Sequence, residues 1–245
     1  MLGLPDGVNA CLFDMDGVVT KTAVVHAAAW QEMFDEFLRQ HAAATGTPFV
    51  PFDPVADYDD YVDGKPRLDG TRSFLQSRGI ELPEGSPDDP PGTPTVHGLS
   101  NRKNELVLAK LAAGAVQVYP GSVRYIRSVK GNGIATAVVS SSANTRQVLE
   151  SAGIADLFDA RVDGLVAAER GLRGKPAPDT FLAAAQLLKT THDRAAVFED
   201  ALAGVEAGRA GRFALVVGVD RVGQASQLAA HGADVVVSDL AELLP

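Results

Sequence analysis

The sequence contains a single cysteine among its 245 residues. Without a second cysteine no disulfide can form within the chain, which excludes a disulfide framework and suits a reducing compartment. The one cysteine, Cys11, lies inside an apolar run. We therefore interpret it as a small, buried hydrophobic side chain.

Basic residues are also few. The 22 lysines and arginines are outnumbered by 31 aspartates and glutamates, which gives a net charge of -9. A protein that binds nucleic acid irrespective of sequence needs a basic stripe, so we expect no nucleic-acid partner. An anionic substrate remains possible, because a few local cations suffice to bind it.

Long apolar runs are missing as well. None approaches the roughly 20 residues that span a bilayer, and "MLGLPDGVNA" lacks the basic and apolar regions of a signal peptide. We therefore expect a soluble, cytoplasmic protein without a membrane partner. The hydrophobic content of 46% and the charged content of 22% are typical of a globular protein with one large domain, or one domain plus a smaller one.

Short apolar segments alternate with helical patterns along most of the chain. "VNACLFD", at 8–14, is typical of a buried strand in a parallel sheet. From "VYPG", at 118–121, onward, strands and helices alternate with short links, which favours an α/β fold with a parallel sheet. The other strands are expected at 134–140, 158–164, 195–200, 213–219 and 233–237, and the helices at 122–130, 144–152, 179–189, 202–209 and 223–230.

The segment from 22 to 115 breaks this alternation. Its patterns predict helices at 22–40, 69–78 and 101–112, with loops at 41–66 and 82–98. We interpret it as a helical insertion after the first strand. Residues 1–21 and 116–245 then form the core, with hinges near 20–22 and 117–121, and the first strand pairs with strands from the second half of the chain.

Polar side chains follow three of the expected strands. Asp14 follows the first strand, Ser140 follows "AVV", and Glu199 and Asp200 follow "AAVF". Ligands of doubly wound sheets bind at the carboxyl ends of the strands, so these groups should meet in one crevice. Several buried carboxylates need a cation, and Mg²⁺ prefers such oxygen ligands and shares them with phosphate.

The pair Asp14 and Asp16 is a weak signal by itself, because the chain has a second D-x-D at Asp57 and Asp59. We interpret that second pair as a solvated acidic surface in a loop. The first pair differs because an apolar strand delivers it and Gly17 follows. Helix capping or turn formation is the alternative role for these aspartates.

"RGKPAPDTF" supplies a cation, Lys175, between prolines that restrict the backbone. This lysine could balance the carboxylates and hold a phosphoryl oxygen, or it could be a solvated loop residue. The hydroxyl of Ser140 and nearby backbone N–H groups could bind the same phosphate. The alternative for Ser140 is a hydrogen bond to a neighbouring turn.

Four segments together resemble the motifs of the haloacid dehalogenase superfamily and follow one another in the same order as in that superfamily. They are "FDMDGVVT", "VVSSSAN", "GKPAPDTF" and "FEDALAGVEAG". Within it, nearly the whole chain resembles the β-phosphoglucomutase-like branch, which carries an α-helical cap. The resemblance implies a Rossmann-like doubly wound parallel sheet as the core, with 22–115 as the inserted cap. It also implies a Mg²⁺-dependent aspartyl-phosphate intermediate.

The same resemblance implies a role for each motif residue. Asp14 becomes the nucleophile, and Asp16 the general acid and base. Ser140 and Lys175 bind the transferring phosphoryl group. The implied metal ligands are Asp14, Asp16 through its backbone carbonyl, and Asp200, with Glu199 either a ligand or a partner of the ligands.

Further matches lie in the cap. "TKTAVVHAAAW" resembles the mutase segment in which a threonine, a histidine and a tryptophan recur, here Thr22 at the hinge and His26 and Trp30 at the substrate. His26 and Trp30 are one turn apart and could instead pack the cap helix. Lys21 departs from the branch, where this position is acidic.

A mutase must hold a phosphate at each end of its sugar. Arg67 in "DGKPRLDG", Lys103 in "SNRKNE" and Asn144 in "SSSAN" match residues around the phosphate that does not react. As an alternative, Arg67 and Lys103 could be solvated surface charges. Ala143 stands where the branch has a lysine, so one phosphate-site cation is missing or replaced.

We therefore predict a sugar-phosphate mutase that converts β-D-glucose 1-phosphate to glucose 6-phosphate through a 1,6-bisphosphate. The alternative is a Mg²⁺-dependent phosphatase of a small phosphorylated sugar or acid, and a third possibility is a non-catalytic regulatory domain. The set Asp14, Asp16, Lys175 and Asp200 counts against the third, since binding alone needs no nucleophile. A monomer or weak homo-oligomer is expected.

Overall fold

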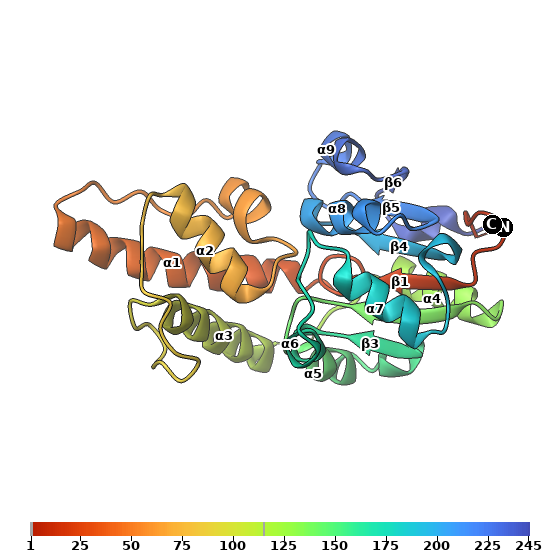
Figure 1. Ribbon diagram of the computed structural model, residues 1–245, viewed down its shortest axis with the longest axis horizontal. Coiled ribbons are helices and arrows are strands. Elements are labelled where there is room, and N and C mark those ends of the chain that lie inside the picture. Colours follow the sequence, from red (N-terminus) through yellow and green to blue (C-terminus); the bar gives the residue numbers. More distant parts are fainter. Residues whose placement is uncertain (1, 115) are drawn as a thin grey trace. The chain divides into compact units, whose positions relative to one another are not determined.

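A computed structural model describes residues 2–114 and 116–245, and in these ranges six strands form one sheet (Figure 1). The strand order is β3-β2-β1-β4-β5-β6, and every neighbouring pair is parallel. The first strand therefore pairs with strands from the second half of the chain, as predicted, and the α/β class is confirmed. The strands are β1 (Ala10–Phe13), β2 (Ala135–Val139), β3 (Ala160–Val162), β4 (Ala195–Glu199), β5 (Leu215–Val219) and β6 (Val235–Val237).

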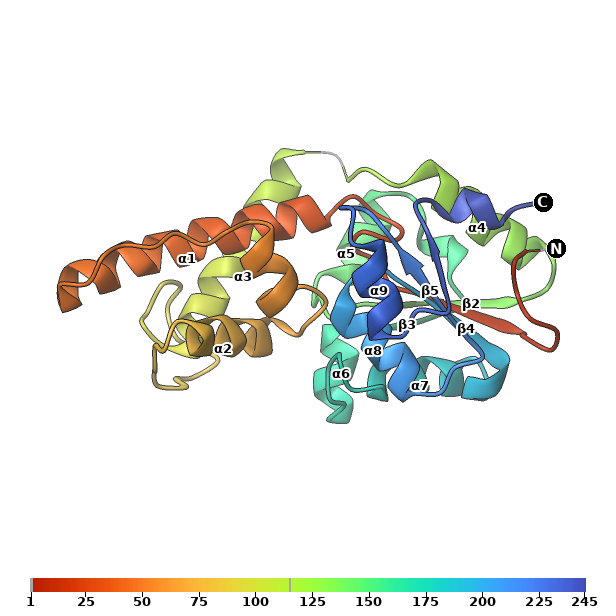
Figure 2. The ribbon, with the colours of Figure 1, turned by 90° about the horizontal axis from the view of Figure 1, so that it is seen from above.

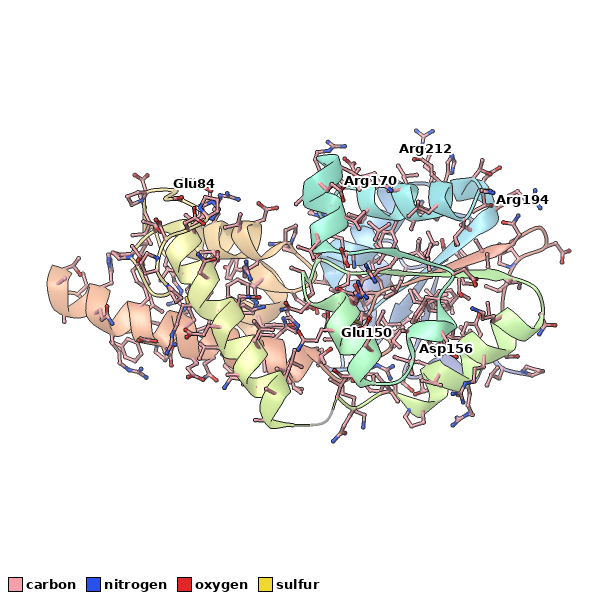
Figure 3. All side chains as sticks on the ribbon, turned by 90° about the horizontal axis from the view of Figure 1, so that it is seen from below. Glu84, Glu150, Asp156, Arg170, Arg194 and Arg212 are labelled. Atoms are coloured by element: carbon pink, nitrogen blue, oxygen red, sulfur yellow. The ribbon has the colours of Figure 1, made fainter. Side chains whose placement is uncertain are left out.

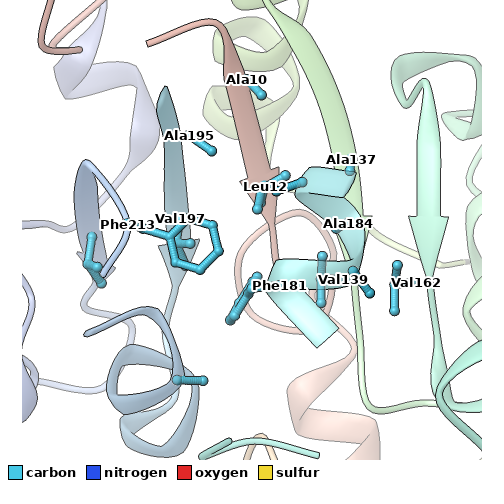
Figure 4. Packing of buried hydrophobic residues seen from close by; sticks show 14 of the residues in the cluster. Ala10, Leu12, Ala137, Val139, Val162, Phe181, Ala184, Ala195, Val197 and Phe213 are labelled. Carbon is cyan, nitrogen blue, oxygen red and sulfur yellow. The ribbon is translucent and has the colours of Figure 1, made fainter. Parts of the chain in front are cut away.

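Helices cover both faces of the sheet, because side chains alternate along each strand. On one face Leu12 and Val197 pack in a cluster with Phe181 of α7 (Figure 4). On the other face Phe13 lies edge-on to Tyr125 of α4, with ring centroids 6.3 Å apart. Figure 2 shows α4 and α7 on opposite sides of the sheet. The fold is thus the predicted Rossmann-like doubly wound core.

The helices of this part of the chain are α4 (Pro120–Gly131), α5 (Thr145–Ser151), α6 (Gly164–Arg170), α7 (Asp179–Leu187), α8 (Leu202–Ala210) and α9 (Ala225–His231), with 3₁₀ turns η2 (Ala155–Leu157), η3 (His192–Arg194) and η4 (Leu240–Leu243). No helix was predicted at α6, because none of its residues is fully buried and it therefore lacks the apolar stripe of a core-facing helix. Asp163 caps its start by accepting hydrogen bonds from the Leu165 and Val166 amides, and Gly171 ends it in a left-handed conformation.

The chain divides into two compact units. The core unit comprises residues 1–21 and 116–245, and the helical unit comprises residues 22–115. The helical unit contains α1 (Ala23–Thr45), the π-helical turn η1 (Tyr58–Val62), α2 (Arg67–Ser77) and α3 (Val96–Ala113). None of the helices in the described residues is both long and apolar enough to cross a membrane.

Aromatic side chains form the interior of the helical unit. The Phe34 ring lies 4.1 Å from that of Phe74, 5.4 Å from that of Phe52 and 5.3 Å from that of Trp30, between centroids. Full burial of side chains of this size stabilises a fold by about 1.5–3 kcal/mol each. The buried face of α1 continues to Ala42, which is why this helix runs past its predicted end at residue 40.

The segment at 82–98 is a loop, as predicted, but its last residues belong to α3. The Thr95 hydroxyl accepts a hydrogen bond from the Gly98 amide, so α3 starts at Val96 rather than at the predicted residue 101. Elsewhere in the loop the Asp89 carboxylate accepts a hydrogen bond from Thr95, and Glu84 pairs with Arg72. Figure 3 labels Glu84.

The interpretation of the second D-x-D as solvated surface is wrong for Asp57. Its carboxylate accepts a hydrogen bond from Arg78 at 2.7 Å and is mostly buried. Burial, followed by repulsion from Asp60 and Asp53, raises the pKa of Asp59 to about 6. This acidic segment forms η1 and its flanks within the predicted 41–66 loop, and Asp57 contributes to the structure of the helical unit.

Candidate active site

Three acidic side chains meet at the carboxyl ends of β1 and β4. Asp14 directly follows β1, Glu199 ends β4, and Asp200 comes next. One ligand oxygen from each lies within 4.8 Å of the others, and all three residues are buried. The strands are neighbours in the sheet, and the Asp14 amide donates to the Phe198 carbonyl at 2.9 Å. The acids therefore meet at the carboxyl edge of the sheet in the core unit, as expected from the strand ends.

Lys175 is the cation of this cluster. Its Nζ donates to Oδ1 of Asp14 and to Oε1 of Glu199, each at 2.5 Å, and the residue is only 3% exposed. Burial lowers the pKa of Lys175, but the two carboxylates outweigh burial and raise it above its ordinary value. The lysine is therefore protonated at neutral pH, and the alternative of a solvated loop lysine is wrong.

The charge of the cluster is not balanced by Lys175 alone. Burial raises the pKa of Asp14 well above its ordinary value; Lys175 lowers it, and Glu199 and Asp16 raise it again. An ionised Asp14 thus needs more positive charge than one ammonium group supplies. A divalent cation between Asp14 and Asp200 would supply that charge, and these hard oxygen donors fit Mg²⁺.

Two glycines allow the carboxylates to approach the backbone. A Cβ atom on Gly17 would lie 1.7 Å from Oδ2 of Asp200, and Gly17 has a φ of +91°. A Cβ atom on Gly204, in α8, would lie 1.7 Å from Oε1 of Glu199. Any side chain at either position would displace an acid of the cluster.

Glu199 already has several partners. Its Oε1 accepts from Lys175, and its Oε2 accepts from the amides of Asp200 and Ala201 at 2.8 and 3.0 Å. Both oxygens are thus engaged in holding the neighbouring groups of the cluster. This arrangement favours, of the two expected roles for Glu199, that of a partner of the ligands.

Ser140 brings the end of β2 next to Asp16. The Ser140 hydroxyl donates to Oδ2 of Asp16 at 3.3 Å and accepts from the Ser142 amide at 3.1 Å. The backbone amide of Asn144, just before α5, in turn donates to the Ser142 hydroxyl at 3.1 Å. Ser140 therefore contacts both the second aspartate and its own turn, so the two roles considered for it are compatible.

In the helical unit, Lys103 lies beside two of the residues matched in the sequence. Its Nζ is 2.8 Å from Nδ1 of His26 and 4.7 Å from the centroid of the Trp30 ring. Lys103 is 5% exposed, so its interpretation as a solvated charge is wrong. Trp30 is 3% exposed and packs in the interior of the helical unit, which agrees with the alternative role given for it above, packing of the helix. Contacts of His26 and Trp30 with substrate stay predictions.

Arg67 and Thr22 are the remaining matched residues of the helical unit. Arg67 is the first residue of α2, and its Nε is buried without a hydrogen-bond partner among the described residues. Burial lowers the pKa of Arg67. Thr22 is buried directly before α1, and its hinge role stays a prediction.

Two residues near the acidic cluster, Gln224 and Arg221, belong to no motif in the sequence and were not predicted. The amide of the Gln224 side chain donates to the Asp200 carbonyl at 3.1 Å, and Arg221 contacts the backbone after Asp16. Both follow β5, whose carboxyl end lies at the same edge of the sheet. That position was the only signal in the sequence, because an isolated arginine or glutamine forms no motif.

A protein-family model, that of the haloacid dehalogenase-like hydrolases, matches residues 8–212 of the sequence. The chain belongs to this family. Among the haloacid dehalogenase-like hydrolases, the chain is 59% identical, over 100% of its own length and 94% of the relative's, to a β-phosphoglucomutase of Mycobacterium tuberculosis (strain CDC 1551 / Oshkosh). It is 32% identical to the β-phosphoglucomutase of Bacillus subtilis (strain 168), over 96% and 92% of the two chains.

A solved haloacid dehalogenase-like structure agrees with these matches. The crystal structure of β-phosphoglucomutase from Clostridium difficile superposes with a TM-score of 0.75 and 25% identity, covering 96% of this chain and 93% of that one. The chain therefore lies in the β-phosphoglucomutase branch of the family, as the resemblance of nearly the whole chain predicted.

Proposed function

We propose that the chain is a sugar-phosphate mutase that converts β-D-glucose 1-phosphate to glucose 6-phosphate through the 1,6-bisphosphate. The observation that carries this proposal is the buried Asp14 carboxylate, held by Lys175 beside Asp200. A purely regulatory domain has no use for such a group. The similarity to β-phosphoglucomutases extends over nearly the whole chain, at 59% and 32% identity, and supports the choice of a mutase over a phosphatase.

In the proposed reaction, Asp14 carries a phosphoryl group at the start. The 6-hydroxyl of β-glucose 1-phosphate attacks that phosphorus, Asp16 accepts the hydroxyl proton, and the bond between phosphorus and Asp14 breaks. In the return step Asp14 attacks the phosphorus at C1. Asp16 then gives its proton to the C1 oxygen as the O–P bond breaks, which releases glucose 6-phosphate. Two easier steps thus replace one direct transfer.

The neighbouring residues orient these groups. Lys175 fixes Oδ1 of Asp14, so we propose Oδ2 as the attacking atom. Ser140 donates to Asp16 and, with Lys175, is proposed to bind oxygens of the transferring phosphoryl group. Positioning of this kind supplies much of the catalysis of phosphoryl transfer.

We propose that the metal is Mg²⁺, held by the Asp14 and Asp200 carboxylates and the Asp16 carbonyl, with Glu199 supporting Asp200 and Lys175. When bound, the ion neutralises the charge that develops on the phosphoryl oxygens. We further propose, from the low cysteine content, that the enzyme works in the reducing cytoplasm.

Removal of divalent cations should abolish turnover. Treatment with excess EDTA followed by gel filtration leaves the acids of the cluster without their counter-charge, so Asp14 no longer attacks phosphorus efficiently. Added Mg²⁺ should restore the rate, measured by glucose 6-phosphate formation, whereas added Na⁺ at equal ionic strength should not. Full turnover in the chelated protein would show that the carboxylates serve another purpose.

We propose that Arg67, Lys103 and Asn144 bind the phosphate that does not react, and that His26 and Trp30 lie at the sugar. Arg67 supports this assignment, because its Nε is buried without a partner among the described residues and a phosphate oxygen is a strong acceptor for a guanidinium group. Lys103 is held in place by its contacts with His26 and Trp30.

Arg67→Ala should lower the kcat/KM of the mutase reaction by about 10- to 10²-fold, the value of a charge-assisted hydrogen bond to phosphate. Hydrolysis of a small phosphoryl donor without a second phosphate, such as acetyl phosphate, should change little. Arg39→Ala is the control, because Arg39 is an exposed arginine of the same unit. Equal losses with both substrates would mean that Arg67 supports the fold rather than the distal phosphate.

Phosphorus NMR tests the proposed function directly. The wild-type protein receives β-glucose 1-phosphate and Mg²⁺, with and without a catalytic amount of glucose 1,6-bisphosphate as primer. A mutase accumulates glucose 6-phosphate without inorganic phosphate, and the primer shortens its lag. Stoichiometric inorganic phosphate, indifferent to the primer, would instead identify a phosphatase.

A further inference from the structure

The backbone turn that follows Asp16 also meets the segment that returns from residues 22–115. The Gly17 amide donates to the Thr20 carbonyl at 2.8 Å, which closes the turn. The Tyr119 amide then donates to the Val19 carbonyl at 2.9 Å. The placement of Asp16 therefore depends on a short turn that lies outside the six-stranded sheet.

Arg221 contacts this turn from the loop after β5. Its Nε donates to the Gly17 carbonyl at 2.8 Å, and its Nη2 lies 3.4 Å from the Val18 carbonyl. Its guanidinium carbon is 3.6 Å from the centroid of the Tyr119 ring, and Nη1 donates to the Ser238 carbonyl at 2.7 Å. One largely buried guanidinium group thus joins the turn after Asp16 to the returning segment.

The loop that carries Arg221 is itself well anchored. The Asp220 carboxylate accepts hydrogen bonds from the amides of Val222, Gly223 and Gln224. The Gln224 side chain also donates to the Asp200 carbonyl. Residues 220–224 therefore contact the Gly17 carbonyl, next to Asp16, and the Asp200 carbonyl. Because this stretch is itself anchored, it can hold both backbone segments in place.

We infer that Arg221 is a positioning residue, which keeps the Asp16 carboxylate beside Ser140 by holding the Gly17 and Val18 carbonyls. The inference rests on the proposed acid and base role of Asp16. The planar guanidinium fork is essential to it, because it binds separate carbonyls along its edge while its face stacks on Tyr119. A lysine at this position keeps the charge but can do neither as well.

The test separates the step that needs Asp16 from the one that does not. Rapid mixing with p-nitrophenyl phosphate reports attack by Asp14, because the weakly basic p-nitrophenolate leaves without a proton. Decay of the phosphoenzyme on addition of β-glucose 1-phosphate reports proton removal by Asp16. In Arg221→Lys the burst of p-nitrophenolate should stay within about threefold of wild type, whereas transfer to the sugar should slow by about 10²-fold, as for a misplaced catalytic group. KM for the sugar should change little.

Arg78→Lys is the matched control. Arg78 also donates to a carbonyl, that of Pro51, pairs with an aspartate, Asp57, and lies over an aromatic ring, that of Phe74. It does so within the helical unit, away from the residues of the acidic cluster in the chain. Both rates should equal those of wild type in this variant.

Two results would overturn the inference. In the first, both rates of Arg221→Lys equal those of wild type. In the second, both rates fall equally and the thermal midpoint of unfolding falls with them, which indicates a general disruption of the fold. If the wild-type phosphoenzyme decays to inorganic phosphate instead of bisphosphate, the proposed mutase function fails. The two rates, with water as the acceptor, still test Arg221 in that case. Failure of the inference and failure of the function are therefore distinguishable.

Discussion

Asp14→Asn is expected to abolish the phosphoenzyme and to lower turnover by about 10⁴-fold or more, as loss of a nucleophile does in other covalent enzymes. The amide has nearly the shape of the carboxylate, so the site should keep its geometry. Its oxygen is a poor nucleophile, however, and Glu199 is not free to replace it, since both oxygens of Glu199 are engaged with Lys175 and two backbone amides. The phosphoenzyme is measured by mass spectrometry after incubation with glucose 1,6-bisphosphate.

The second D-x-D of the chain provides the control for this experiment. Asp59→Asn alters an aspartate in the same local sequence pattern but in η1 of the helical unit, and it should leave phosphoenzyme formation unchanged. Asp14→Asn should remain folded by circular dichroism, because Glu199 still pairs with Lys175. A phosphoenzyme in Asp14→Asn would show that the nucleophile is another residue.

Asp16→Ala is expected to lower mutase turnover by about 10²- to 10⁴-fold, the usual contribution of a general acid or base. Without this carboxylate the sugar hydroxyl keeps its proton during attack, and the leaving sugar oxygen receives none. Attack by Asp14 on acetyl phosphate should survive, because acetate leaves without protonation. Stopped-flow measurement of phosphoenzyme formation and decay separates the two steps.

Asp60→Ala is a suitable comparison for Asp16→Ala, since it removes an aspartate from the surface of the helical unit. Its rates of phosphoenzyme formation and decay should match those of wild type. Wild-type mutase turnover in Asp16→Ala would refute the acid and base role. So would an equal loss of phosphoenzyme formation from acetyl phosphate, because that step requires no proton from Asp16.

The fold class and the meeting of the acids could be predicted from the sequence. Apolar runs such as "VNACLFD" carry their strand signal locally, and parallel strands end at one edge of a sheet. Asp14, Glu199 and Asp200 lie together for this reason. Their chemical roles came from the resemblance of the motifs to a known family, and the buried cluster agrees with that resemblance.

Helix limits were predictable only in part. The start of α3 depends on one hydroxyl cap at Thr95, within a segment whose proline and glycine content is typical of a loop. Asp57 is mostly buried and paired rather than solvated because it contacts Arg78, 21 positions later in the chain. Such partners are chosen by packing within the helical unit, and local composition does not encode them.

Local patterns and chain order were enough to predict the parallel α/β core, the inserted helical segment and the strand ends that carry the acids. Two further facts became known only from the packing of the folded chain: Lys175 is a buried partner of Asp14, 161 positions away, and Arg221 holds the carbonyl of Gly17, 204 positions away. Burial and partner choice arise when distant segments pack together. A lysine or arginine in a loop has the same local sequence signal whether it is solvated or enclosed.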